Sequence, residues 1–582
     1  MYLLQIISDM RYFMKKIYIL WLICLMILLS ACAKTTSLNF NSYLDELFIS
    51  FIGDDPMMVN ATLYNTNQYE LNELEVKAVS LSEQQEKEMF SDYKSIITKL
   101  NKFNNNNLRE EDILTKDILI DYLERELNFE GLYYYSTALG SYLGYQAQLP
   151  MILAEYRFDD EKDVKDYFAY LETTKASFKT IIQYEYEKYE LGIGLNTQII
   201  NRVMAQCDEL IVSEASFLIP TFNNRIDKLA LSNTKKEELK AKNILLVKQN
   251  FLGAYKYLKS ELKKLAMLSD DRFIVDEGRK DYYEALFQKA TGVDSDIPEV
   301  ISYLDKLLND LSKRKLAHGG TYEIVSSNYD LVEDRGFEDI IPFFISEMKV
   351  DFPKVEDSQY EIKEIHDSMT EFSSPAMYFI SPIDYNQKEV IYINPLNFKT
   401  TNNYVYQTLA HEAYPGHLYQ NLYLKNREIH DIRKILDYPG YAEGWATYVE
   451  NYVVKYAGAN DYIQDILMIH NSFAYVILGR VDIGINYEGW NIEECERFLG
   501  KYFNLDTIDV EDIYYDMLEV PTNYLQYYYS YYQIIDLQED FKEMMGNEYS
   551  DYLFHKIYLD TGPASFAILA LEYQKYQEKV LK

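Results

Sequence analysis

The sequence contains few cysteines and few basic residues relative to acidic ones, and both shortages restrict its function. Of the four cysteines, Cys24 and Cys32 lie near the N-terminus, which leaves Cys207 and Cys495. A disulfide framework or a cysteine metal cluster is therefore excluded, and two buried thiols are favoured over one disulfide. The 57 basic residues face 92 acidic ones, for a formal net charge of −35. So acidic a chain is repelled by phosphates, and we expect no nucleic-acid partner.

The N-terminus lacks an apolar run long enough to span a bilayer. The uncharged stretch from Ile17 to Leu29 follows two lysines. It is shorter than the roughly 20 residues that a membrane helix needs, but it is typical of a signal peptide. The residues Leu-Ser-Ala-Cys that end at Cys32 resemble the lipobox of bacterial lipoproteins, in which the cysteine carries the lipid. The alternative is an ordinary signal peptide or a marginal membrane anchor, and translation can start at Met1 or Met14.

These features predict an exported protein with its folded part outside the cytoplasm. Residues 1–31 are the expected signal, residues 32–41 a tether, and Cys32 the lipid anchor in the cell membrane. Because an acidic chain is not attracted to anionic headgroups, the lipid itself must hold it there. A single acyl chain binds marginally, so a diacyl anchor is expected.

The remaining chain, residues 42–582, is expected to be a single, mostly α domain. Apolar residues recur three and four positions apart from residue 42 to about 311 and again from Asn403 to the end. Between them, Ala376 to Ile380 and Glu389 to Asn394 are β-prone runs that predict a small antiparallel sheet. We divide the domain into an N-terminal helical half, about 42–320, and a second half, about 321–582.

The chemically distinctive segment is His411-Glu412-Ala413-Tyr414-Pro415-Gly416-His417, which contains two of only seven histidines. In the zinc-protease pattern H-E-x-x-H, histidines four residues apart share one helix face, and the glutamate activates a metal-bound water. Here the spacing is six residues, which is about 240° around a regular helix. Proline and glycine can break the helix and turn His417 back toward His411. The alternative is a helix that simply ends in Pro-Gly-His.

A second segment offers a third metal ligand. Glu443 follows the turn Asp437 to Gly440 and lies in the first turn of another expected helix. Two imidazoles, one carboxylate and a water make a catalytic zinc site with an open position. Glu450, seven residues further on the same face, is either a competing ligand or a residue that supports one. For Glu443 the alternative is a carboxylate favoured by the helix dipole.

Together these segments resemble the bacterial family DUF885, which is grouped with the zincin metallopeptidases. The resemblance covers most of the chain after about residue 40. It is carried by HEAYPGHLYQ (411–420), AEGWATYVE (442–450), GRVDIGINYEGW (479–490), PTNYLQYYYSYYQIIDLQ (521–538) and LDTGPASFAILALE (559–572), and upstream by GRKDYYEALFQKATG (278–292) and AMYFISPIDYNQKEVIYINP (376–395).

The resemblance implies a mostly helical zincin-like fold whose sheet lies beside the active-site helix, and one Zn²⁺. It implies His411, His417 and Glu443 as metal ligands and Glu412 as general base. It also implies Tyr527 as the hydroxyl that hydrogen-bonds the developing oxyanion; the alternative is that Tyr527 is merely one of the six tyrosines between residues 524 and 532.

Two further residues are candidate substrate contacts, each with a structural alternative. The strand from Val390 to Asn394 can add an extended peptide at its edge or be a plain structural hairpin. Arg480 can bind a substrate carboxylate, although a structural ion pair with Asp482 is favoured.

Two departures from the family pattern affect catalysis in this chain. Asn486 replaces a frequent histidine, which predicts slower or differently selective chemistry. Thr522-Asn523 replaces Gly-Gln after Pro521, which puts the local turn in question.

We therefore predict a zinc-dependent hydrolase, specifically a peptidase that acts on peptide substrates. The main alternative is a non-catalytic peptide- or solute-binding lipoprotein on the same fold, and a lesser one is a zinc amidase. The sequence leaves open the substrate sequence, endo- versus exo-cleavage and the oligomeric state.

Overall fold

The computed structural model describes residues 40–580 except 54, 70, 72–73, 270–272, 333–334, 356–358, 366–374, 386 and 396–401. The predicted signal, the lipidation residue Cys32 and most of the tether lie outside the described residues. The first described helix begins at Phe40, inside the stretch predicted as tether.

The N-terminal half is helical, as its periodicity predicts. Helix starts follow ordinary capping chemistry: Asp160, for example, accepts a hydrogen bond from the backbone N–H of Lys162 at 2.6 Å at the start of α8. The π-helical segment η4 (Val247–Phe251) joins α11 to α12. The helices are α3 Phe40–Ile52, α4 Pro56–Thr62, α5 Glu83–Leu100, α6 Glu110–Leu127, α7 Tyr145–Glu155, α8 Glu161–Glu190, α9 Thr197–Val212, α10 Leu218–Lys228, α11 Asn233–Leu246, α12 Leu252–Leu265, α13 Glu277–Thr291, α14 Ile297–His318, α15 Gly320–Asn328 and α16 Phe337–Glu347.

A small sheet follows, made of β1 Gln359–Glu364, β2 Ala376–Phe379 and β3 Lys388–Ile393 in the order β1-β3-β2. The predicted hairpin is confirmed, because β2 pairs antiparallel with β3 and places Tyr378 opposite Ile391. The expectation of a purely antiparallel sheet is wrong, because β1 pairs parallel with β3 on its other side. The charged, half-exposed sequence of β1 carries little strand signal, which explains why it was not predicted.

The C-terminal half is helical again. In it, α17 packs against β2 and α19, and α19 packs against α23 and the π-helical segment η9 (Leu525–Tyr529). Helix α20 is long and apolar enough to cross a membrane, but 61% of its apolar window is buried in the protein, as in a core helix. The helices are α17 Asn402–Glu412, α18 His417–Lys425, α19 Pro439–Tyr452, α20 Asp461–Asn486, α21 Ile492–Leu499, α22 Val510–Glu519, α23 Ser530–Met545, α24 Asp551–Thr561 and α25 Phe566–Val580.

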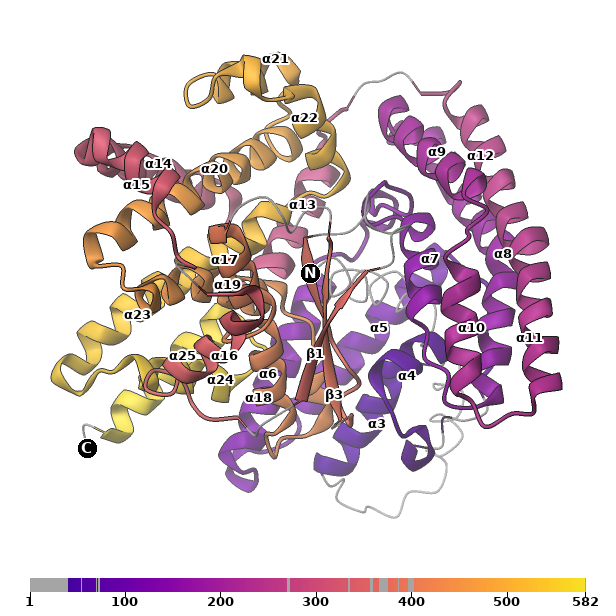
Figure 1. The fold of residues 1–582 in the computed structure, drawn as a ribbon, viewed down its shortest axis with the longest axis horizontal. Coiled ribbons are helices and arrows are strands. Elements are labelled where there is room, and N and C mark those ends of the chain that lie inside the picture. The colour runs from indigo at the N-terminus through magenta and orange to yellow at the C-terminus, as the bar shows by residue number, and fades with distance from the viewer. Residues whose placement is uncertain are drawn as a thin grey trace.

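The sheet lies between the two sets of helices (Figure 1). Helices α7 to α12 stand on one side of it, and α14 to α25 gather on the other. One continuous hydrophobic cluster contains residues of both halves, from Phe40 to Tyr573. Cys207 and Cys495 are buried free thiols, as predicted.

Candidate metal centre

The helix that carries His411 stops where the sequence predicts a break. α17 ends at Glu412, and α18 begins at His417. At Gly416 a Cβ atom would lie 1.8 Å from the backbone oxygen of His411, so only glycine fits there. The indole N–H of Trp445 donates a hydrogen bond to the backbone oxygen of Pro415 at 2.9 Å, which ties the break to α19. The break turns His417 back toward His411.

Glu443 reaches the same point from α19. This helix begins at Pro439, directly after the predicted turn. Next to Glu443, a Cβ atom on Gly444 would lie 2.8 Å from Cβ of Ser530 at the start of α23. The absence of a side chain at Gly444 therefore lets α19 and α23 approach closely and fixes the depth at which Glu443 lies.

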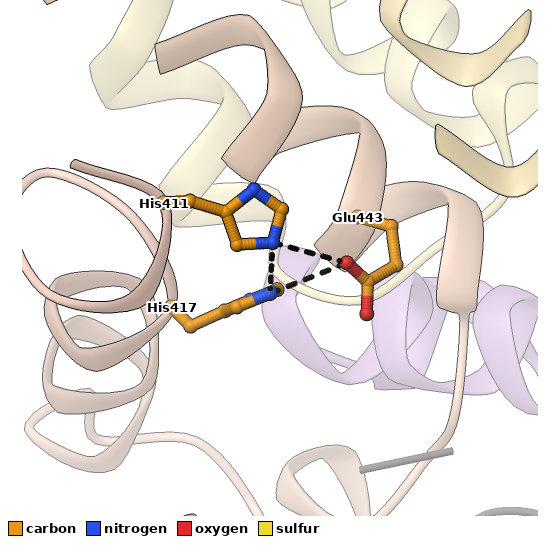
Figure 2. A group of neighbouring side chains, drawn as sticks. All are labelled: His411, His417 and Glu443. Carbon is orange, nitrogen blue, oxygen red and sulfur yellow. Dashed lines mark hydrogen bonds and ion pairs between the residues drawn. The ribbon is translucent and has the colours of Figure 1, made fainter. Parts of the chain in front are cut away.

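The three side chains point toward one another from two sides (Figure 2). The two Nε2 atoms of His411 and His417 are 3.1 Å apart. Oε2 of Glu443 lies 3.5 Å from Nε2 of His411 and 3.3 Å from Nε2 of His417. Ligand atoms about 2.0–2.2 Å from a tetrahedral zinc ion are separated by about 3.3 Å. The three atoms already have the spacing of three tetrahedral ligands.

The site is buried, and one of its oxygens is held only by ion pairs. His411, His417 and Glu443 are each 5% exposed or less. Among the residues that the structure describes, Oε2 of Glu443 forms no regular hydrogen bond and is paired only with the two imidazoles, at 3.3 and 3.5 Å. Buried polar atoms nearly always have well-formed hydrogen bonds, so this oxygen fits a role as ligand of a bound cation. The donor set and its geometry thus fit Zn²⁺.

Glu450 contacts Nδ1 of His411, the ring nitrogen that faces away from the other two side chains. Its Oε1 lies 2.5 Å from Nδ1 of His411, so Nδ1–H donates to the carboxylate and Nε2 is left to bind a metal. Burial opposes the protonated imidazole, but the carboxylates of Glu450 and Glu443 outweigh it and raise the pKa of His411 to about 10. Burial likewise opposes ionisation of Glu443, yet the two histidines lower its pKa. The geometry favours Glu450 as a support for His411 rather than a competing ligand.

The predicted base and oxyanion donor lie beside this group. Glu412 is 3% exposed, and its Oε2 accepts a hydrogen bond from the backbone N–H of Tyr378 in β2 at 2.8 Å. The sheet thus holds the carboxylate that follows His411. The ring of Tyr527, in η9, has its centroid 6.4 Å from that of His411. Sequence reasoning did not anticipate the contribution of Tyr378, because it comes from the backbone.

The comparison with protein families identifies the chain. The family described as "Bacterial protein of unknown function (DUF885)" matches residues 67–319 and 335–572. The chain belongs to DUF885. No curated protein matches it.

Two solved structures resemble this DUF885 chain. One, "the putative lipoprotein from Colwellia psychrerythraea", is 17% identical with a TM-score of 0.77 and covers 93% of this chain and 100% of its own. The other, "a putative lipoprotein of unknown function from Shewanella oneidensis", is 14% identical with a TM-score of 0.61 and covers 94% and 100%. At these identities the likeness establishes a shared fold.

In this DUF885 member β3 ends at Ile393, directly before Asn394, and is not an edge strand. It pairs on both sides, so of the two alternatives the addition of an extended peptide is wrong and the structural hairpin is confirmed. Asn394 is buried, and its backbone N–H donates to the oxygen of Pro375 at 2.8 Å. The strand of the sheet that approaches the metal centre is β2.

Arg480 lies in a structural cluster. Its guanidinium pairs with Glu488 at 2.7 Å and with Asp305 at 3.5 Å, and it lies 4.8 Å from the ring centroid of Trp490. An ion pair is present as expected, but with Glu488 where Asp482 was predicted. The role of Arg480 in binding a substrate carboxylate stays a prediction.

The two departures from the DUF885 pattern meet at Asp482. This carboxylate accepts hydrogen bonds from Nδ2 of Asn486 at 2.7 Å and from the backbone N–H of Thr522 at 2.6 Å. Thr522 has φ +67°, a left-handed conformation that favours glycine. The turn at this position therefore keeps a glycine-like backbone with a threonine, and Asp482 holds it in place.

Proposed function

We propose that this chain is a zinc-dependent hydrolase of the zincin type that cleaves peptide bonds. The observation that carries the proposal is the convergence of three buried ligand atoms, on His411, His417 and Glu443, at 3.1–3.5 Å from one another. A glutamate adjacent to the first ligand, Glu412, adds the base that a hydrolase needs and a binding protein does not.

Each residue has a defined task in this proposal. Zinc, when bound, supplies a Lewis acid that polarises the carbonyl and lowers the pKa of water toward about 7. Glu412 takes a proton from the attacking water, the carbon–nitrogen bond breaks, and Glu412 returns the proton to the leaving amine. The hydroxyl of Tyr527 donates a hydrogen bond to the developing oxyanion. The N–H of Tyr378 keeps the Glu412 carboxylate in place.

We also propose that the protein is exported and anchored in the cell membrane through Cys32. The support is the lipobox-like Leu29-Ser30-Ala31-Cys32 after an apolar run and two lysines. Both similar solved structures are described as a "putative lipoprotein", which agrees with this proposal. Mass spectrometry of the membrane-extracted protein tests the anchor, and an unmodified Cys32 would contradict it.

Metal analysis of the purified protein tests the metal centre. We expect one zinc per chain, and its loss in His411→Ala. His470→Ala is the matched control, because His470 is exposed and outside the cluster, and it should keep the metal. A protein without zinc, or a His411→Ala variant with full zinc, contradicts the assignment.

Digestion of a peptide library, followed by mass spectrometry, tests the reaction. We expect cleavage that a chelator abolishes and that Glu412→Gln eliminates while zinc remains bound. Saturable binding without cleavage would instead support the non-catalytic lipoprotein. Cleavage restricted to non-peptide amides would support the amidase.

A further inference from the structure

Exposed tyrosines lie beside the candidate metal centre. Tyr404 is 41% exposed and Tyr475 is 40% exposed. Tyr404 precedes His411 by seven residues on α17, so it lies on nearly the same helix face, about 10 Å along the axis. A large ring exposed this close to the metal ligands can contact a bound substrate.

Tyr475 packs against the segment that carries the predicted oxyanion donor, Tyr527. Its ring stacks on that of Tyr528, with centroids 4.5 Å apart and planes 11° apart. Tyr528 directly follows Tyr527, whose ring lies 6.4 Å from that of His411. Tyr528 is buried and fixes the orientation of Tyr475, so the exposed ring is pre-oriented for stacking.

The electrostatic surroundings of these rings are negative. The buried part of the Tyr404 side chain, the neighbouring Tyr475, and the carboxylates of Glu450 and Glu412 raise the pKa of Tyr404 to about 12. Partial burial and Glu450 likewise raise the pKa of Tyr475. With a divalent cation bound, the carboxylates of Glu412, Glu443 and Glu450 still leave one net negative charge. The whole chain carries −35.

We propose that the exposed rings of Tyr404 and Tyr475, the latter held by Tyr528, form a binding surface for an arginine side chain of the substrate, next to the bond that is cleaved. The planar guanidinium stacks on tyrosine faces, and its charge complements the nearby carboxylates. The chain itself contains such a contact, between Arg157 and the ring of Tyr64, whose centroid lies 5.2 Å from the guanidinium carbon. The inference rests on the proposed function, because it takes the ligand to be a peptide, and it names basic peptides as the substrate class.

The test compares four peptides that differ at one residue next to the cleaved bond: arginine, citrulline, phenylalanine or alanine. Citrulline keeps the planar shape of arginine without its charge. We expect kcat/KM to be about tenfold higher for arginine than for alanine, with citrulline between them, and added salt to reduce the arginine advantage. Tyr404→Ala and Tyr475→Ala should remove most of the advantage, whereas Tyr475→Phe should keep it.

The matched control is Tyr462→Ala, since Tyr462 is 48% exposed on the same helix as Tyr475 but about 20 Å further along it. The inference is overturned if the ratio of kcat/KM for the arginine and alanine peptides is unchanged in both tyrosine variants. It is also overturned if Tyr462→Ala lowers this ratio as much as they do, or if the wild type prefers phenylalanine to arginine.

Equilibrium binding of the same peptides to zinc-loaded Glu412→Gln separates the two proposals. If the tyrosine variants lose an arginine-dependent binding and the wild type cleaves nothing, the binding surface is supported and the hydrolase is refuted. If the wild type cleaves the peptides without preferring arginine, the hydrolase is supported and the binding surface is refuted. If the wild type neither binds nor cleaves these peptides, both proposals fail.

Discussion

Replacing Glu450 with glutamine tests how the protein positions His411. The carboxylate accepts the Nδ1–H of His411 at 2.5 Å, and a glutamine oxygen can accept the same hydrogen bond. Glu450→Gln therefore keeps the orientation of the ring but removes the negative charge that makes Nε2 a stronger donor to a metal. Zinc should still bind with a stoichiometry of one.

The expected loss follows from the environment of the contact. Residues that support a metal-bound histidine typically contribute 10–100-fold to affinity. The His411 side chain is 6% exposed, but that of Glu450 is 21% exposed, so solvent screens part of the charge. We expect Glu450→Gln to weaken zinc binding about 10-fold, or about 1.4 kcal/mol. Glu450→Ala, which loses the hydrogen bond as well, should approach 100-fold.

Competition with a chromophoric zinc chelator, at one pH and one ionic strength, measures both variants. Glu488→Gln is the matched control, because Glu488 pairs with Arg480 and should leave the affinity within about twofold. An unchanged affinity in Glu450→Ala would show that the Nδ1 contact does not tune the metal. A complete loss of zinc in Glu450→Gln, equal to that in His411→Ala, would make Glu450 a ligand and refute the reasoning.

Three further predictions concern the framework around the site. Gly416→Ala should lose zinc and have a lower melting temperature, because the added Cβ would lie 1.8 Å from the backbone oxygen of His411. A variant with normal zinc content would contradict this. Burial lowers the pKa of His555 to about 4, so the unfolded chain binds the extra proton between pH 6.5 and 4. The free energy of unfolding should fall by about 3 kcal/mol over that window as pH drops, and denaturant titrations of His555→Gln should show a shallower dependence. Glu389→Gln should lower the free energy of unfolding by about 3 kcal/mol in the same titration, because the buried ammonium of Lys425 loses the carboxylate that lies 3.2 Å from it. As a control, Lys388→Gln, which removes an exposed ion pair, should lower it by less than about 1 kcal/mol.

The sequence was informative where local chemistry determines the structure. The helix break at Pro415-Gly416, the helix that begins at Pro439 and the hairpin of β2 and β3 depend on residues next to them in the chain. The candidate ligands His411 and His417 stand out because the sequence has few other histidines, and the family resemblance adds Glu443 to them. The family follows from motifs spread along the chain, and its match is confirmed.

What the sequence could not supply are contacts between distant segments. The parallel pairing of β1 with β3 depends on the order of strands in space, which strand propensity does not encode. The bond from the N–H of Tyr378 to Glu412 uses a backbone atom, so no residue type signals it. The stacking of Tyr475 on Tyr528 joins two helices, and many other tyrosines have the same local sequence character.

A divalent cation fits the centre of this cluster. The Nε2 atoms of His411 and His417 face each other at 3.1 Å, and Oε2 of Glu443 lies 3.5 Å and 3.3 Å from them, so all three possible ligand atoms point to one place. A divalent cation accepts lone pairs from all three atoms at once and offsets the cost of burying the carboxylate. This arrangement of three buried ligand atoms therefore favours metal binding, and the stability of the fold should rise when zinc is added.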